Sequence, residues 1–216
     1  MTKTIAAVAF VMIADLCLFA QSDETKRAEF FAGYSFGSAG VNFGAGGLAA
    51  QVYRGRAGHD GFNASAVVNV SRYIGIKGDV SGTYKSGRFS FQVPSGSQNN
   101  TIATIVFSGK SSIYNFLGGF QVKDNASKRR LAPFAHALVG AARRNNEIKG
   151  GPILCILIIP CASSTTETGF AGAFGGGLDV RLGKRIALRL FQIDYNPIKF
   201  NAGTDHNYRF STGLVF

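Results

Sequence analysis

The chain has 216 residues, of which 46% are hydrophobic, 12% aromatic and only 16% charged, and its net charge is +11. Many aromatic side chains and few charges exclude an intrinsically disordered chain. The 28 glycines argue against a long helical rod, because glycine destabilises helix interiors. Beyond the N-terminal region no apolar stretch is as long as a membrane-spanning helix. These features leave an all-β protein, either soluble or in an outer membrane.

The positive charge is spread along the chain rather than gathered in one segment. The chain has 23 lysine and arginine residues against 12 aspartate and glutamate residues, and the only tight cluster is Lys128-Arg129-Arg130. Nucleic-acid-binding proteins usually concentrate basic residues on one face or arm. We therefore expect no nucleic-acid partner, and the pattern favours contacts with lipid phosphates or buried ion pairs.

Residues 1–20 have the features of a removable secretory signal. Lys3 gives a positive start, an apolar run follows from Ile5 to Ile13, and Ala20 precedes the expected cleavage site before Gln21. An N-terminal core helix is the alternative, but the abrupt change to polar residues at 21–24 argues against it. We predict a signal peptide over 1–20, a short lead over 21–27 and one domain over 28–216.

Two cysteines remain in the exported chain, and both lie in the apolar segment 152–161. Cys155 and Cys161 can form a disulfide in an oxidising compartment. No second cysteine pair or nearby histidine completes a zinc site, so we expect no metal and no cofactor. The segment itself predicts either a contact site for another surface or a loop that folds over its neighbours.

The mature chain contains eight segments in which apolar and polar or small side chains alternate. A period of two is the signature of a β-strand. In the first segment only Phe31 interrupts the alternation, and the phase of the fifth and seventh segments is uncertain, as a β-bulge would make it. The predicted strands are 28–37, 62–70, 76–84, 112–122, 131–142, 169–180, 186–195 and 207–216.

The connections between these segments alternate in length. Short turns are expected at 71–73, 123–130 and 182–185. The other connections are longer, at 38–60, 85–111, 144–168 and 196–206. This alternation is typical of an antiparallel meander in an outer membrane, with short turns towards the periplasm and long loops outside.

The two faces of the predicted strands differ in polarity, which favours lipid over a soluble ligand-binding barrel. A soluble barrel would place the apolar face inside. The period alone does not separate the two cases, but the signal peptide and aromatic residues near strand ends, such as Phe36, Tyr84 and Tyr208, favour a membrane. In lipid the sheet must close, and eight strands enclose a lumen that side chains nearly fill.

Four segments carry a resemblance to a known family: Glu29 to Phe36, Gly175 to Val180, Arg189 with Asp194-Tyr195, and the terminal Tyr208 to Phe216. The chain resembles the small eight-stranded OmpA-like outer-membrane β-barrels. The resemblance implies a closed, antiparallel, up-and-down transmembrane barrel, monomeric in the bacterial outer membrane among lipid and lipopolysaccharide. It also implies that the outer-membrane assembly machinery reads the terminal strand through Tyr208, Phe210, Leu214 and Phe216.

Charged and amide side chains occupy the face that the lumen should receive. Similar barrels pair such groups across the lumen, and buried charges must be paired. We predict a network that plugs the lumen, with a narrow diffusion pore as the alternative. Its predicted charged members are Glu29, Lys77, Asp79, Asp179, Arg189 and Arg209. Further predicted inward residues are Asn63, Ser65, Asn69, Asn115 and Gln121, with His136 and Asp194 as candidates.

An enzyme is not expected. Two of the three histidines, His59 and His206, fall in predicted outer loops beside Asp60 and Asp205. No nucleophile motif accompanies them, and adjacent residues point apart in an extended chain. We therefore read them as solvated loop residues. A structural or surface-interaction role is predicted, and a lipid-A-modifying hydrolase on a barrel scaffold stays the alternative.

Overall fold

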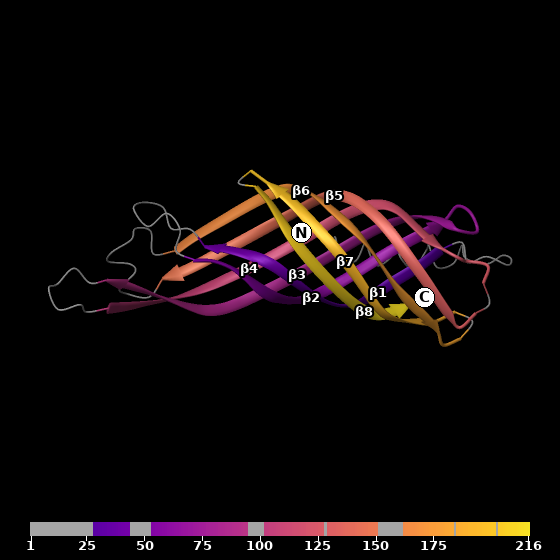
Figure 1. Ribbon diagram of the computed structural model, residues 1–216, viewed down its shortest axis with the longest axis horizontal. Coiled ribbons are helices and arrows are strands. Elements are labelled where there is room, and N and C mark those ends of the chain that lie inside the picture. Colours follow the sequence, from indigo (N-terminus) through magenta and orange to yellow (C-terminus); the bar gives the residue numbers. More distant parts are fainter. Residues whose placement is uncertain are drawn as a thin grey trace, which may run out of the picture.

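Eight antiparallel strands close into one barrel, as predicted (Figure 1). The computed structural model describes residues 28–43, 53–94, 102–127, 129–150, 162–183, 185–201 and 203–216. The strands are β1 (Ala28–Phe43), β2 (Tyr53–Asn69), β3 (Ile74–Pro94), β4 (Ile102–Lys123), β5 (Leu131–Gly150), β6 (Ala162–Arg181), β7 (Ala187–Phe200) and β8 (Gly203–Val215).

The first and last strands pair with each other and leave no open edge in the barrel wall. Their register runs from Phe31 opposite Val215 to Ser38 opposite Tyr208. Phe30 and Phe216 extend the ladder, because each backbone NH donates to the other's carbonyl, at 3.1 and 2.8 Å. Closure satisfies backbone groups that water cannot reach in lipid.

Side chains alternate between the lumen and the outer surface, and the outer surface is apolar over a continuous band. Its members include Val68, Ile76, Val80, Phe116, Phe120, Val139, Phe174, Ile193 and Leu214, all exposed. Aromatic residues border this band on one side: Phe36, Phe62, Tyr84, Tyr114, Phe170 and Tyr208. Beyond them the outward positions become polar, as at Asp60, Arg143 and Thr168. A large exposed apolar band with an aromatic border is the lipid-facing surface of a transmembrane barrel.

The strands are much longer than the sequence predicts. β3 and β4 have 21 and 22 residues and take up most of the predicted loop 85–111. Likewise β1, β2, β5 and β6 extend into the predicted loops 38–60 and 144–168, and β7 ends at Phe200 while β8 begins at Gly203, within the predicted loop 196–206. Beyond the apolar band the outward positions become polar, so the apolar-outward alternation of the membrane-spanning part stops although backbone pairing continues.

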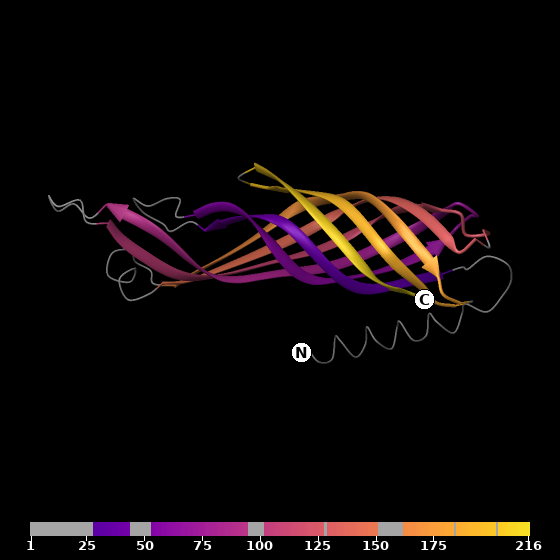
Figure 2. The same cartoon turned by 60° about the horizontal axis from the view of Figure 1, so that its bottom comes forward.

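The two ends of the barrel differ. At the short-turn end, tight turns join β2 to β3, β4 to β5 and β6 to β7, and the C-terminus lies here (Figure 2). At the hairpin end, the β3–β4 hairpin projects farthest (Figure 1). Pairing between β2 and β3 stops at Asp60 opposite Tyr84, and pairing between β6 and β7 stops at Phe170 opposite Lys199. Strands β3 to β6 stay paired beyond these points and form a projecting four-stranded sheet.

Two features explain why the phase of the fifth and seventh segments is ambiguous. In β7 the register with β8 shifts between Arg189 and Gln192, so both of these side chains point inward with two residues between them. In β5 the alternation is regular, but the inward residues include apolar ones such as Phe134 and Leu138. Polarity therefore does not distinguish the two faces of β5.

Candidate functional site: the barrel lumen

The lumen is lined by buried charged side chains from six strands. All six charged residues predicted to face inward are on its wall and at most 5% exposed. They are Glu29 on β1, Lys77 and Asp79 on β3, Asp179 on β6, Arg189 on β7 and Arg209 on β8. Two further charged residues, Lys123 on β4 and Asp194 on β7, lie among them and are equally buried.

One group of ion pairs lies near the short-turn end. The Lys123 amine donates to Glu29 at 2.8 and 3.1 Å and to Asp179 at 2.8 Å. The Arg189 guanidinium donates from Nε and Nη2 to the two oxygens of Asp179, at 2.8 and 3.2 Å. Two cations and two carboxylates from β1, β4, β6 and β7 are therefore joined across the lumen.

A second group continues from the first through Gln192. Its amide oxygen accepts from Arg189 at 2.8 Å, and its amide nitrogen donates to Asp194 at 2.7 Å. Arg209 donates to Asp194 at 2.7 and 2.9 Å and to Asp79 at 2.8 Å. Because each guanidinium bridges partners on different strands, the network links opposite walls of the barrel.

Neutral side chains complete the second group. The Asn63 amide donates to Asp79 at 2.9 Å, and Arg209 also donates to the Ser81 hydroxyl at 2.6 Å. Asn115 donates to the same hydroxyl at 3.2 Å. Each carboxylate of this group therefore accepts from more than one donor, as buried charges require.

We call the eight charged residues the ionic network. It holds four carboxylates (Glu29, Asp79, Asp179, Asp194) and four cations (Lys77, Lys123, Arg189, Arg209), so its charges balance. Lys77 is held differently from the others, with its amine 3.4 Å from His136 Nδ1 and 5.6 Å from the centre of the Phe134 ring. On its other side, His136 Nε2 lies 2.9 Å from Asp194 Oδ1 but is not aligned for a hydrogen bond.

Aromatic rings enclose Arg189. Its guanidinium carbon lies 4.4 Å from the centre of the Phe31 ring and 4.1 Å from that of Phe134, and both rings are buried. This contact explains why Phe31 interrupts the alternation of the first segment, because here an apolar ring belongs on the lumen side. Gly33 leaves space for that ring, since a Cβ at residue 33 would lie 2.8 Å from it.

A buried apolar cluster occupies the lumen beyond the ionic network. On each shared strand its members lie nearer the hairpin end than the ionic residues do. The sequence did not predict it, because only polar residues were assigned to the lumen. The apolar cluster consists of Ala39, Ile113, Leu117, Leu138, Ala142, Ala171, Ala173, Ile198 and Phe200.

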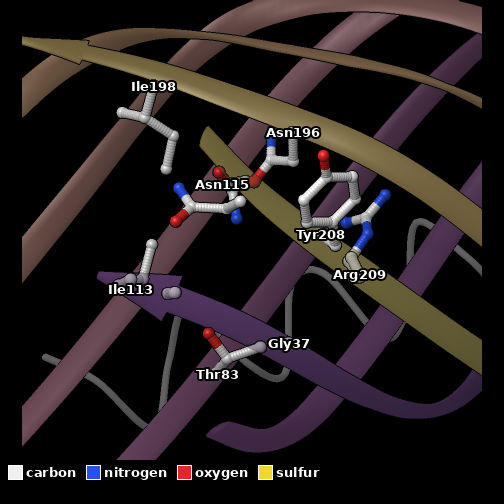
Figure 3. A pocket seen from close by; sticks show the side chains of 10 residues that line it. Gly37, Thr83, Ile113, Asn115, Asn196, Ile198, Tyr208 and Arg209 are labelled. Atoms are coloured by element: carbon white, nitrogen blue, oxygen red, sulfur yellow. The ribbon is translucent and has the colours of Figure 1, made fainter. Parts of the chain in front are cut away.

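A small pocket remains between the ionic network and the apolar cluster (Figure 3). Arg209, Asn115 and Asn196 line it together with Ile113 and Ile198. It has room for about one or two water molecules. Asn115 Oδ1 has no hydrogen-bond partner in the described part of the chain, which makes it an acceptor for such a water.

The histidines do not form a shared site at the rim. His59 belongs to β2 and is fully buried, with Nδ1 3.0 Å from the Ala57 carbonyl oxygen. His206 belongs to β8, is exposed on the outer surface and contacts the Tyr195 hydroxyl. The expectation of a solvated loop residue is therefore wrong for His59, while His206 is exposed as expected but lies on a strand instead of in a loop. Both hairpins continue as strands, and strand geometry sends the two rings to opposite sides of the wall.

Some residues of the network were missed for identifiable reasons. Lys123 was assigned to a turn, but it is the last residue of β4 and turns inward. Gln192 lies beyond a register shift that a strict period of two does not follow. Cys155, Cys161 and residues 1–27 lie outside the described residues. Within the described ranges, no group of three potential ligands could hold a metal ion, and no helix could cross a membrane.

A closed eight-stranded barrel with a lipid-facing outer surface and a polar lumen defines a small outer-membrane barrel protein. The chain belongs to the family described as outer membrane protein beta-barrel domain, whose model matches residues 6–216. The predicted resemblance and fold class are thus confirmed, and the family places the protein in the bacterial outer membrane.

Solved structures of similar fold are bacterial outer-membrane proteins. Ail, the attachment invasion locus protein of Yersinia pestis, in complex with the heparin analogue sucrose octasulfate, aligns with a TM-score of 0.52. It is 15% identical, and the match covers 88% of this chain and 99% of Ail. Neisserial surface protein A aligns with a TM-score of 0.51 at 12% identity over 89% of this chain and 98% of its own. No curated protein sequence matched.

Proposed function

We propose that this protein is a non-conducting, non-enzymatic barrel that carries a surface-interaction element outside the outer membrane. The observation that supports the proposal is the set of side chains that cross the lumen. The ionic network joins opposite walls, and the apolar cluster occupies the space beyond it. A diffusion pore would need a continuous polar passage, whereas the pocket between the two layers has room for only about one or two waters.

The projecting sheet of β3 to β6 is the proposed interaction element. Among the described residues, its two lateral strands, at 85–94 and 162–169, pair with no strand on one side. Unpaired strand edges present backbone NH and carbonyl groups to which an extended segment of another protein can add. The closed barrel holds this sheet outside the membrane, since short turns of such barrels face the periplasm.

Lipopolysaccharide is the proposed lipid partner on the outer side. Just beyond the aromatic border, exposed basic residues project outward at Arg56, Arg88, Lys110, Arg143 and Lys199. Arg56 also packs over the Tyr208 ring, with its guanidinium carbon 5.8 Å from the ring centre. Cations directly above an aromatic border suit the phosphates of a glycolipid head group.

Single-channel recording in planar bilayers tests the filled lumen. The refolded wild-type chain should insert, as shown by heat-modifiable mobility, and carry little current. Arg209→Ala removes the bridge between Asp79 and Asp194, so it should raise the conductance or lower the stability of the barrel. Large, steady wild-type currents would favour the pore instead. Release of acyl chains or phosphate from lipopolysaccharide would favour a hydrolase.

Trimming the projecting sheet tests the interaction element. A variant with a short turn in place of residues 86–110 keeps the closed part of β3 and β4. We expect normal yield and heat-modifiable mobility, but less adhesion of cells displaying the chain to one another and to purified extracellular proteins. Unchanged adhesion would refute a role for this sheet.

We also propose that the outer-membrane assembly machinery reads the terminal strand. Tyr208, Phe210, Leu214 and Phe216 all project outward and are exposed. Deleting Phe216 also removes both backbone hydrogen bonds to Phe30, so assembly of the barrel should fail. Export should proceed as in the wild type. The product should then collect in the periplasm and be protease-sensitive. Normal amounts of heat-modifiable protein in the outer membrane would contradict this role.

A further inference from the structure

The three turns at the short-turn end form one continuous, strongly basic rim. The Asn125 NH donates to the Arg72 carbonyl at 3.0 Å, and the Arg181 NH donates to the Arg130 carbonyl at 2.8 Å. These bonds join the β2–β3 turn to the β4–β5 turn and that turn to the β6–β7 turn. The arginines of this basic rim are Arg72, Arg129, Arg130, Arg181 and Arg185, all exposed or partly exposed.

Acidic residues barely offset this charge. Among the described residues, the only acidic side chain on the basic rim that is partly exposed is Asp124, 3.2 Å from Arg72 Nε. The Arg72 guanidinium, through its hydrogen bond, holds the pKa of Asp124 below its usual range, so this carboxylate stays charged and is matched by one arginine. Arg129 and Arg130 have no carboxylate partner within the described chain.

Exposed apolar side chains lie directly beside the basic ones on every turn. Tyr73 is half exposed beneath the Arg72 guanidinium, which lies 5.0 Å from its ring centre. Leu131 follows Arg130 and is 55% exposed. Leu182 and Ile186 flank the third turn and are also exposed. Apolar bodies with cationic tips are the pattern of residues that lie at a membrane–water interface.

We propose that the basic rim binds the phosphate head groups of anionic phospholipids in the periplasmic leaflet. The exposed apolar neighbours place the arginines at the lipid boundary rather than in open solvent, which favours a lipid over a periplasmic polymer. The hairpin end differs, because Asp60, Glu147, Glu167 and Asp205 offset part of its positive charge. The inference is independent of whether the lumen conducts.

Spin-labelled lipids test this proposal on the full chain, refolded in phosphatidylcholine bilayers. Labelled phosphatidylglycerol should associate with the wild-type barrel more strongly than labelled phosphatidylcholine. Arg129→Gln with Arg130→Gln should reduce this selectivity, by roughly fivefold per side chain as an upper value at low salt. High salt should reduce it in the wild type as well.

The matched control is Arg129→Lys with Arg130→Lys, which keeps both positive charges on the basic rim. This variant should keep most of the selectivity. Both variants are checked by heat-modifiable mobility, and single Arg130→Gln serves if the double variant does not fold. Absence of wild-type selectivity, or equal loss in the control, overturns the proposal. Salt-sensitive binding to purified peptidoglycan that is lost with Arg129 and Arg130, without lipid selectivity, would assign the basic rim to the wall instead.

Discussion

The ionic network and the apolar cluster lie in the same lumen and are held by different physical means. The ionic network uses directional bonds, as where Arg209 joins Asp79 and Asp194 at 2.8 and 2.7 Å. The apolar cluster has no such bonds, and side chains such as Leu138 and Ile198 are fully buried by shape alone. The contrast teaches that the inner wall of a small barrel can be packed with apolar side chains as well as with paired charges.

Small residues on β6 make room for both layers. A Cβ at Gly175 would lie 2.4 Å from Asp194 Oδ1, and one at Gly177 would lie 2.9 Å from the Phe134 ring. Farther along β6, Ala171 and Ala173 belong to the apolar cluster. The inner face of β6 therefore leaves room that large side chains from other strands occupy.

The largest effect should come from breaking the ionic network at Arg209. Arg209→Met leaves Asp79 and Asp194 without their shared guanidinium, so the free energy of unfolding should fall by about 3–5 kcal/mol. Urea unfolding in lipid vesicles measures this loss. Arg209→Lys, which keeps a charge but not the two-sided geometry, should lose less. A loss below about 1 kcal/mol for the methionine variant would show that the network does not hold the walls together.

A smaller loss of stability should follow from opening the apolar cluster at Leu138. This side chain is 0% exposed, so Leu138→Ala should lower the free energy of unfolding by about 2–4 kcal/mol. The ionic network stays whole, and planar-bilayer conductance should remain low. Val139→Ala on the lipid-facing side of β5 is the control and should lose less. High conductance in Leu138→Ala would mean that the apolar cluster, not the ionic network, blocks the lumen.

A third, smaller effect should come from Phe31, whose ring stacks on Arg189 of the ionic network. Phe31→Leu keeps an apolar side chain but removes the ring over Arg189, and we expect a loss of about 1 kcal/mol. Phe30→Leu, on the outward side of the same strand, is the matched control. Equal losses in the same unfolding measurement would mean that the stacking contact contributes nothing of its own.

The smallest effect should come from an ion pair outside both layers. Arg72 and Asp124 are 56% and 39% exposed, so solvent screens their attraction. Arg72→Ala should leave the urea midpoint unchanged within error. A clear shift would show that the joined turns, rather than the filled lumen, limit the stability of the barrel.

Residue patterns alone predicted the barrel and much of the ionic network. Where one face meets lipid and the other a polar lumen, the period of two is clean, so Glu29, Lys77, Asp79, Asp179 and Arg209 could be placed inside. The alternating connections in turn indicated a meander, and the closed sheet follows from the need to pair every backbone group in lipid.

Other positions depend on contacts between strands that are distant in the sequence, and local alternation does not predict them. The register shift in β7 brings Gln192 to the same face as Arg189. Lys123 lies beside Glu29 and Asp179, which are 94 and 56 residues away along the chain. The apolar cluster and the long hairpins were not predicted, for one shared reason. The strand segments that form them lack the alternation of apolar outward and polar inward residues that marks a membrane-spanning strand. Inside the lumen and beyond the membrane, packing partners and backbone pairing set the structure, and these are properties of the closed barrel.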